Sequence, residues 1–177
     1  MRKILVENQP IHTFIALMRI GIGAIFTWAF VDKLWGLGFA TCRSDGVVDV
    51  MCGQAWANGG SPTTGFLQFG TSGPFESFYT SLAGNPFIDW AFMLGLLLVG
   101  VALILGMGIK LAVTGGSLLL LMMWSAVLPP EHNPVISEHL IYILGLLIIL
   151  VSNRHQVLGL GRWWESRPIV RRYGLLK

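Results

Sequence analysis

The chain has 177 residues, of which 54% are hydrophobic and only 12% are charged, and its formal net charge is +3. A soluble domain of this size does not need apolar runs as long and as free of charge as those found here. We therefore expect residues 1–177 to form one integral membrane domain, and we expect the basic charge to reflect membrane orientation and not nucleic-acid binding.

The first apolar stretch predicts a membrane span over residues 12–35. It is too long for a signal peptide and ends in Asp32-Lys33-Leu34-Trp35 instead of a small-residue cleavage site, so we expect an uncleaved signal anchor. Arg19 lies about eight residues into this span, roughly 12 Å at the rise of an α-helix. An ionisable group at this depth is a candidate for cofactor binding. The alternative is that Arg19 extends to the headgroups or bonds to carbonyl groups of another helix.

Residues 36–86 form a long loop between the first and second expected spans. Cys42 and Cys52 lie in this loop, and in an oxidising compartment they are expected to form a structural disulfide. A redox-active pair is the alternative, although the two cysteines lack C-x-x-C spacing. Farther along the loop, helical spacing of apolar side chains predicts a short amphipathic helix, at Phe75, Phe78, Tyr79 and Leu82.

Three more apolar stretches predict spans over residues 87–107, 110–128 and 135–152, each near the ~20 residues that a helix needs to cross a bilayer. The tight turn Gly106-Met107-Gly108-Ile109-Lys110 makes the second and third spans an antiparallel hairpin. A proline-rich turn precedes the fourth span and breaks the helix there. The expected fold is thus an all-α integral membrane protein, a four-transmembrane-helix bundle with a short amphipathic helix in the long loop.

The basic residues collect at one end of the four expected spans. They are Arg2, Lys3, Lys110, Arg154, Arg162, Arg167, Arg171, Arg172 and Lys177, whereas only Lys33 and Arg43 lie at the other end. By the positive-inside rule both termini are expected in the cytoplasm and the cysteine loop outside, with the plasma membrane as the location. The basic tail over residues 153–177 is expected to lie on the inner leaflet, attracted by anionic lipid.

Two charged pairs at the outer ends of the spans are the catalytic candidates. In the first pair, Lys33 would donate to a carbonyl group or an anion, and Asp32 would orient it or relay a proton. In the second, His139 titrates near neutrality and could bond to a quinone carbonyl, with Glu138 as a proton relay. The plain alternatives are a charged helix end for Asp32 and Lys33, a favourable N-terminal charge for Glu138 and an interhelical hydrogen bond for His139.

Aromatic side chains near the second pair are candidates for cofactor binding. Tyr142 follows His139 by one helical turn, on a similar face, and Trp124 lies near the outer end of the third span. Simple packing is the alternative for both. His132 belongs to the same outer group of polar residues. The sequence predicts no metal site and no haem or iron–sulfur ligand pattern.

Each expected span carries a short motif. The motifs are Arg19-Ile20-Gly21 with Asp32-Lys33, then Gly100-Val101-Ala102-Leu103-Ile104-Leu105-Gly106, then Lys110-Leu111-Ala112, and last Asn133-Pro134 with Glu138-His139-Leu140-Ile141-Tyr142. Together they resemble the DoxX/DoxD family of small four-helix membrane proteins. The resemblance covers the four spans but neither the cysteine loop nor the basic tail.

This resemblance implies a redox role in the membrane, because the family includes the membrane subunit of an enzyme that oxidises thiosulfate and reduces quinone. It implies a quinone-linked oxidoreductase subunit that works with a soluble redox partner or within a larger membrane complex. The site is expected at the outer ends of the helices. The few outer basic residues count against thiosulfate, because they are poorly suited to attract an anion.

Two other classes of function remain open from the sequence. One is a non-catalytic accessory subunit that stabilises a larger respiratory complex, or a homo-oligomer, through its glycine-rich spans. The other is a carrier for a small solute or lipid, which is less favoured because no span is interrupted in mid-membrane.

Overall fold

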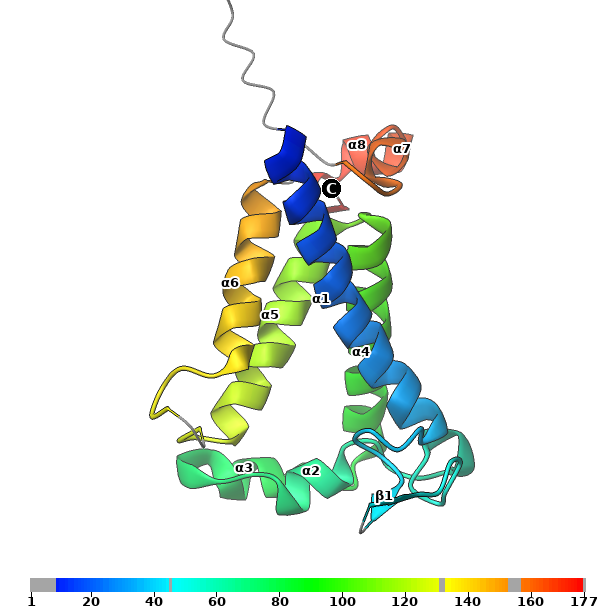
Figure 1. Cartoon of the computed structure of the whole chain (residues 1–177), viewed down its shortest axis with the longest axis vertical. Coiled ribbons are helices and arrows are strands. Elements are labelled where there is room, and N and C mark those ends of the chain that lie inside the picture. The colour runs from blue at the N-terminus through cyan, green and yellow to red at the C-terminus, as the bar shows by residue number, and fades with distance from the viewer. Residues whose placement is uncertain (1–8, 45, 131–132, 153–156, 177) are drawn as a thin grey trace, which may run out of the picture.

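The computed structural model describes residues 9–44, 46–130, 133–152 and 157–176, and most of these are helical. The long helices are α1 (Gln9–Trp35), α4 (Pro86–Leu105), α5 (Ile109–Ala126) and α6 (Glu138–Val151). They stand side by side, and short elements gather at both ends of the bundle (Figure 1). Within the described ranges, the three helices α1, α4 and α5 are long and apolar enough to cross a membrane, and α6 is a shorter apolar helix of 14 residues.

Local chain signals explain where these helices begin and end. The side chain of Asn85 accepts a hydrogen bond from Phe87 N at 3.0 Å and so caps the start of α4. Gly106, with a φ of 74°, ends α4 in the left-handed conformation. The expected hairpin of α4 and α5 is therefore present, with boundaries within two residues of those predicted.

The helix α6 starts later than predicted, at residue 138 instead of 135. The cause is Asn133, whose side-chain oxygen accepts hydrogen bonds from Val135 N at 3.0 Å and Ile136 N at 2.9 Å. This turn holds the chain out of the helix until Ser137, which has an extended backbone.

All four long helices contribute to one apolar interior. Its buried side chains include Ile22, Phe26, Met93, Leu103, Val113, Leu120 and Leu146. The helices α1 and α4 cross at glycine residues, and a Cβ atom on Gly100 would lie 2.3 Å from Thr27 Oγ1 and 3.0 Å from Gly23 O. The backbones can approach this closely only because these positions carry no side chain.

The outward faces of the same helices are also apolar. Large side chains on every long helix are exposed, as shown by Phe14, Leu98, Leu118 and Val151. Leu98, for example, is 65% exposed in the middle of α4. Apolar surface this extensive is unfavourable in water and suits contact with lipid, so the helices point to a membrane protein.

One end of the bundle carries the long loop, and we call it the cysteine-loop end. Its elements are β1 (Arg43–Ser44), β2 (Val47–Val48), η1 (Trp56–Asn58), α2 (Thr64–Phe69), η2 (Gly73–Phe75) and α3 (Glu76–Ser81). The expected short helix near Phe75–Leu82 is present as α3, and α2 is a second short helix that was not expected; both lie across the ends of α4 and α5 (Figure 1). We call residues 64–81 the platform. The small antiparallel hairpin of β1 and β2 was not expected in an all-α fold.

The opposite end carries the basic tail, which forms α7 (Gly161–Glu165), α8 (Pro168–Arg172) and η4 (Gly174–Leu176). Lys110 Nζ at the start of α5 donates to Gly174 O at 2.7 Å, and Trp164 Nε1 donates to Leu176 O at 2.7 Å. The tail is therefore folded against the bundle, at the end where α1 begins (Figure 1).

Candidate functional site

Lys33 lies beside an apolar cavity of about 280 Å³ between the bundle and the platform. The wall comes from α1, α2, α3, α4 and α5 and includes Leu67, Tyr79, Phe92 and Met123. Lys33 is the one charged residue among the described residues that line it. A mostly apolar pocket with a single well-placed polar group is the usual form of a site for a small amphipathic molecule.

A second cavity, of about 650 Å³, adjoins the first. The two share Lys33, Ala40, Pro62 and Phe66 as lining residues. The rest of the second wall combines the polar residues Thr41, Gln54, Ser61 and Thr64 with Phe69 and three glycines. Lys33 therefore lies where an apolar space meets a more polar one, and we call the second space the polar cavity.

The ammonium group of Lys33 is available to a ligand. The side chain is half-buried, and in the described part of the chain it has no hydrogen bond or ion pair. An ammonium group has three donors and no acceptor, so it is suited to bind a carbonyl oxygen or an anion. Of the four predicted catalytic residues, Lys33 is the one that lines these two cavities.

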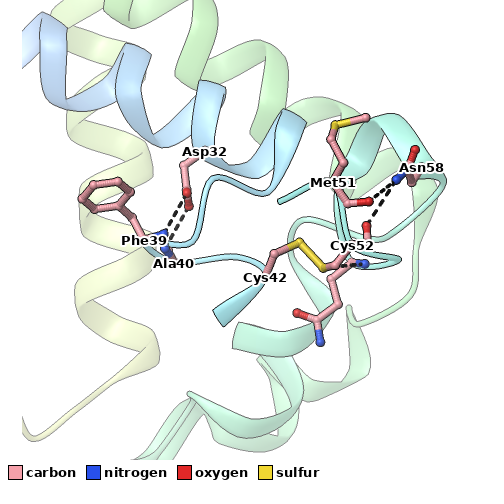
Figure 2. Close-up of a disulfide and its surroundings, with 8 residues drawn as sticks. Asp32, Phe39, Ala40, Cys42, Met51, Cys52 and Asn58 are labelled. Carbon is pink, nitrogen blue, oxygen red and sulfur yellow. Dashed lines mark hydrogen bonds between the residues drawn. A yellow bond between two sulfur atoms is a disulfide. The ribbon is translucent and has the colours of Figure 1, made fainter. Parts of the chain in front are cut away.

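Asp32 is used by the fold. Its carboxylate is only 1% exposed, and its two oxygens accept hydrogen bonds from Phe39 N at 3.0 Å and Ala40 N at 2.9 Å (Figure 2). Charge-assisted bonds of this kind fix the chain that leaves α1. Because Ala40 lines both cavities, Asp32 positions the wall beside Lys33.

Sequence reasoning missed the contacts that hold the platform over the cavity. At one side, Asp89 Oδ1 accepts from Ser61 Oγ at 2.8 Å and from Thr63 Oγ1 at 2.6 Å, so the loop before α2 is fastened to the first turn of α4. At the other side, Tyr79 OH lies 2.6 Å from Ser125 Oγ. The two attachments close the apolar cavity with pairs of side chains that are up to 46 residues apart, which no local pattern reveals.

The platform is also joined to the end of α5 through its backbone. Ser72 N donates to Ala126 O at 2.9 Å. Gly73 follows with a φ of +77°, and a Cβ atom there would lie 1.8 Å from Leu128 O. Glycine is therefore required at this turn, because any side chain would collide with the backbone.

The second predicted pair does not join the first. Glu138 is exposed, and His139 Nδ1 lies 3.8 Å from Glu138 Oε1 and 3.2 Å from Ser137 Oγ, so its described contacts are local. Neither residue lines the two cavities beside Lys33. The start of α6 and the end of α1 lie on opposite sides of the molecule in Figure 1.

The aromatic candidates have contacts of their own. Trp124 Nε1 donates to Val135 O at 2.8 Å and ties the end of α5 to the segment before α6. Tyr142 packs against the bundle core. Both contacts correspond to the packing alternative. His132 lies outside the described residues.

Arg19 is almost fully buried, with 2% of its surface exposed, and its guanidinium group binds main-chain carbonyls. It donates to Leu103 O, to Ile104 O at 3.2 Å and to Leu158 O. The carbonyls of Leu103 and Ile104 lie in the last turn of α4, where the helix dipole favours a cation, and that of Leu158 lies in the segment before α7. Arg19 thus joins α1, α4 and the tail, and it lies at the end of the bundle opposite Lys33.

The expected disulfide between Cys42 and Cys52 is present (Figure 2). Cys42 is 5% exposed, whereas Cys52 is partly accessible, and Cys52 Sγ accepts from Gln54 N at 3.3 Å. Asn58 Nδ2 donates to the carbonyl oxygens of Met51 and Cys52 and so holds the segment that contains Cys52.

The cysteine-loop end therefore combines a hydrogen-bond donor, Lys33, with an apolar cavity and with the Cys42–Cys52 disulfide in the adjacent loop. Over the described ranges, no group of three or more His, Cys, Asp and Glu side chains is placed to hold a metal ion. Comparison of the chain with protein-family models, with curated proteins and with solved structures finds no match.

Proposed function

We propose that this chain is a quinone-binding subunit of a membrane oxidoreductase, with the quinone ring in the apolar cavity and one carbonyl oxygen at Lys33. The observation that carries the proposal is the position of Lys33, which has no hydrogen bond or ion pair to the described residues and lies at the junction of an apolar cavity and a more polar one. A quinone has matching parts, an apolar ring and tail with two carbonyl acceptors. Phe66 and Met122 line the apolar cavity and are also exposed, so the tail would leave between them towards lipid.

Lys33, the polar cavity and Asp32 would each have a different role in quinone reduction. A quinone takes up two electrons and two protons when it is reduced, which places negative charge on its oxygens. Lys33 would stabilise that charge in a space of low dielectric, where a fixed cation is most effective. Water in the polar cavity, beside Thr41, Ser61 and Thr64, is the path for protons. Asp32 would keep Ala40 and the cavity wall in place.

The proposal includes four membrane crossings, with both termini in the cytoplasm and the cysteine loop outside the plasma membrane. The crossing of α6 is supported by its exposed apolar side chains, Ile141, Leu144, Ile148 and Val151. Exposed Val135 and Ile136 extend this surface, and Asn133 satisfies their backbone donors. A disulfide at one end and basic residues at the other support the orientation.

The partner is part of the proposal. The resemblance to the DoxX/DoxD family supports an electron source outside this chain, either a soluble redox protein or a larger membrane complex. An accessory subunit without quinone binding is the competing role, and quinone binding separates the two.

The test is quinone binding by the full chain in quinone-free lipid nanodiscs, measured by quenching of tryptophan fluorescence. Lys33→Met keeps the length and apolar stem of the side chain but removes a charge-assisted hydrogen bond. Such a bond contributes about 1.5–3 kcal/mol, so affinity should fall about 10- to 100-fold. Lys110→Met is the matched control, because Lys110 bonds to Gly174 at the other end of the bundle. Wild-type protein without saturable binding would favour the accessory role.

A further inference from the structure

We propose that the Cys42–Cys52 disulfide is a second reaction centre, which oxidises a dithiol substrate and passes the electron pair to the quinone beside Lys33. This inference rests on the proposed function, because it needs quinone as the final acceptor. It adds an activity, dithiol oxidation, and assigns a role to the cysteine loop that the quinone site alone does not require.

The first support is the wall of the polar cavity. Thr41, which precedes Cys42, lines it, and so do Gly53 and Gln54, which follow Cys52. Lys33 lines the same cavity. The backbone on both sides of the disulfide therefore borders the space that opens to the quinone position, although the three segments are separated in sequence.

The second support is the unequal burial of the two cysteine residues. Cys42 is buried so closely against Gly36 that a Cβ atom on this glycine would lie 2.2 Å from Cys42 Sγ. Cys52 is partly accessible, and its sulfur accepts the hydrogen bond from Gln54 N. A thiol from solution would therefore reach Cys52 more readily than Cys42, and the Gln54 N donor would stabilise the Cys52 thiolate when it is released.

The third support is the anchoring of the loop on both sides of the disulfide. Asp32 holds the segment that leads to Cys42, and Asn58 holds the backbone at Met51 and Cys52 (Figure 2). These contacts do not involve the disulfide itself. They would keep the two thiols close together after reduction, so that the bond can form again.

The reaction has two balanced steps. In the first, a substrate thiolate attacks Cys52 Sγ, the bond to Cys42 breaks, and Cys42 leaves as a thiolate. The second substrate thiol then attacks the substrate sulfur of the mixed disulfide, which releases oxidised substrate and Cys52. In the second step, the Cys42 and Cys52 thiols lose two electrons and two protons to quinone, so the disulfide forms again and one hydroquinone is produced.

The test uses the wild-type chain in nanodiscs under anaerobic conditions, so it does not depend on cysteine variants that might misfold. The disulfide is reduced with a phosphine, the phosphine is removed, and ubiquinone is added. Thiols are followed by the gel shift of a maleimide polymer, and hydroquinone is followed by absorbance. We expect one hydroquinone per disulfide formed, and no reoxidation without quinone. Lys33→Met should slow the reaction at least tenfold, and Lys110→Met should leave it unchanged.

The same samples separate the two proposals. If quinone does not bind, the proposed function fails. If quinone binds but the thiols persist, only the dithiol activity is wrong. Two further arms identify the source of the dithiol, one with dithiothreitol and one with a reduced, unfolded disulfide protein. Continuous hydroquinone formation in either arm supports the activity and names the source, and its absence from both arms overturns it.

Discussion

Two cations of α1 show how differently a buried charge can be used. Arg19 gives its donors to the carbonyls of Leu103, Ile104 and Leu158, so its charge is compensated within the fold. Lys33 lines two cavities and has no such partner among the described residues. The first arrangement is typical of a structural residue and the second of a binding residue.

Replacement of Arg19 tests this division. Arg19→Met leaves buried carbonyls at the end of α4 without donors and detaches the segment at Leu158, so we expect a loss of unfolding free energy on the order of 2–4 kcal/mol. Arg19→Lys should recover only part of it, because one ammonium group cannot replace a planar guanidinium that serves several carbonyls. Thermal unfolding in detergent measures the change.

Quinone binding by the folded fraction of the Arg19 variants separates a structural role of Arg19 from a cofactor-binding role. If Arg19→Met keeps the melting temperature of the wild-type protein but loses quinone affinity, the cofactor-binding prediction for Arg19 is right and the structural role is wrong. Unchanged quinone affinity with a lower melting temperature supports a structural role for Arg19.

Sequence alone could predict which residues of α1 deserved attention, but not what each one does. A charge within an apolar run is visible directly, which is why Arg19, Asp32 and Lys33 could be selected. The partner groups could not be predicted, because Asp32 binds backbone N–H groups that are exposed only by the path of the loop after Trp35. Every residue type except proline has such an N–H group, so these partners leave no pattern in the sequence.

At the scale of elements, the crossing of α1 and α4 depends on close backbone contact at Gly100. Gly100→Ala would place a Cβ atom 2.3 Å from Thr27 Oγ1 and 2.8 Å from Thr27 N, so the two helices must separate. We expect a loss of about 1–3 kcal/mol, as found for overpacked cores. Gly21→Ala is the matched control on α1, because a Cβ atom there meets nothing within 4 Å.

Thermal unfolding of both variants in the same detergent gives the comparison. The control should be as stable as the wild-type protein or slightly more so, since alanine is the better helix former. Equal melting temperatures for Gly100→Ala and Gly21→Ala would contradict the close crossing.

The long helices were predicted to within a few residues because their signals are local, namely apolar runs that end at glycine, proline and asparagine. The platform and its cavity were not predicted, because they form from contacts such as Asp89 with Ser61 and Tyr79 with Ser125. Whether Lys33 and His139 lie close together depends on which helices are neighbours at one end of the bundle. Hydropathy gives depth in the membrane but no angular position, so it could not decide that question.

At the scale of the whole molecule, the two ends of the bundle differ in chemistry. One end carries the disulfide, the platform and the polar cavity, whereas the other carries α7 and α8 with Arg162, Arg167, Arg171 and Arg172 (Figure 1). Exposed Trp163 and Ile169 lie among these arginines, and Arg167 lies 4.0 Å from the Trp163 ring. A surface of this composition suits the headgroup region of an anionic leaflet.

This asymmetry predicts the orientation of the chain, and reporter fusions in bacterial cells test it. A fluorescent protein fused after Lys177 should fluoresce, because it folds in the cytoplasm, and alkaline phosphatase inserted between Gly59 and Gly60 should be active, because it needs the oxidising side. Ala57, Asn58 and Gly59, which precede this insertion point, are exposed, so the bundle should tolerate the insertion. Alkaline phosphatase fused after Lys177 is the control and should be inactive. Activity of that control would place the C-terminus on the oxidising side, the same side as the cysteine loop. Only α4 and α5 would then cross the membrane after that loop, and α6 would lie on the membrane instead of through it.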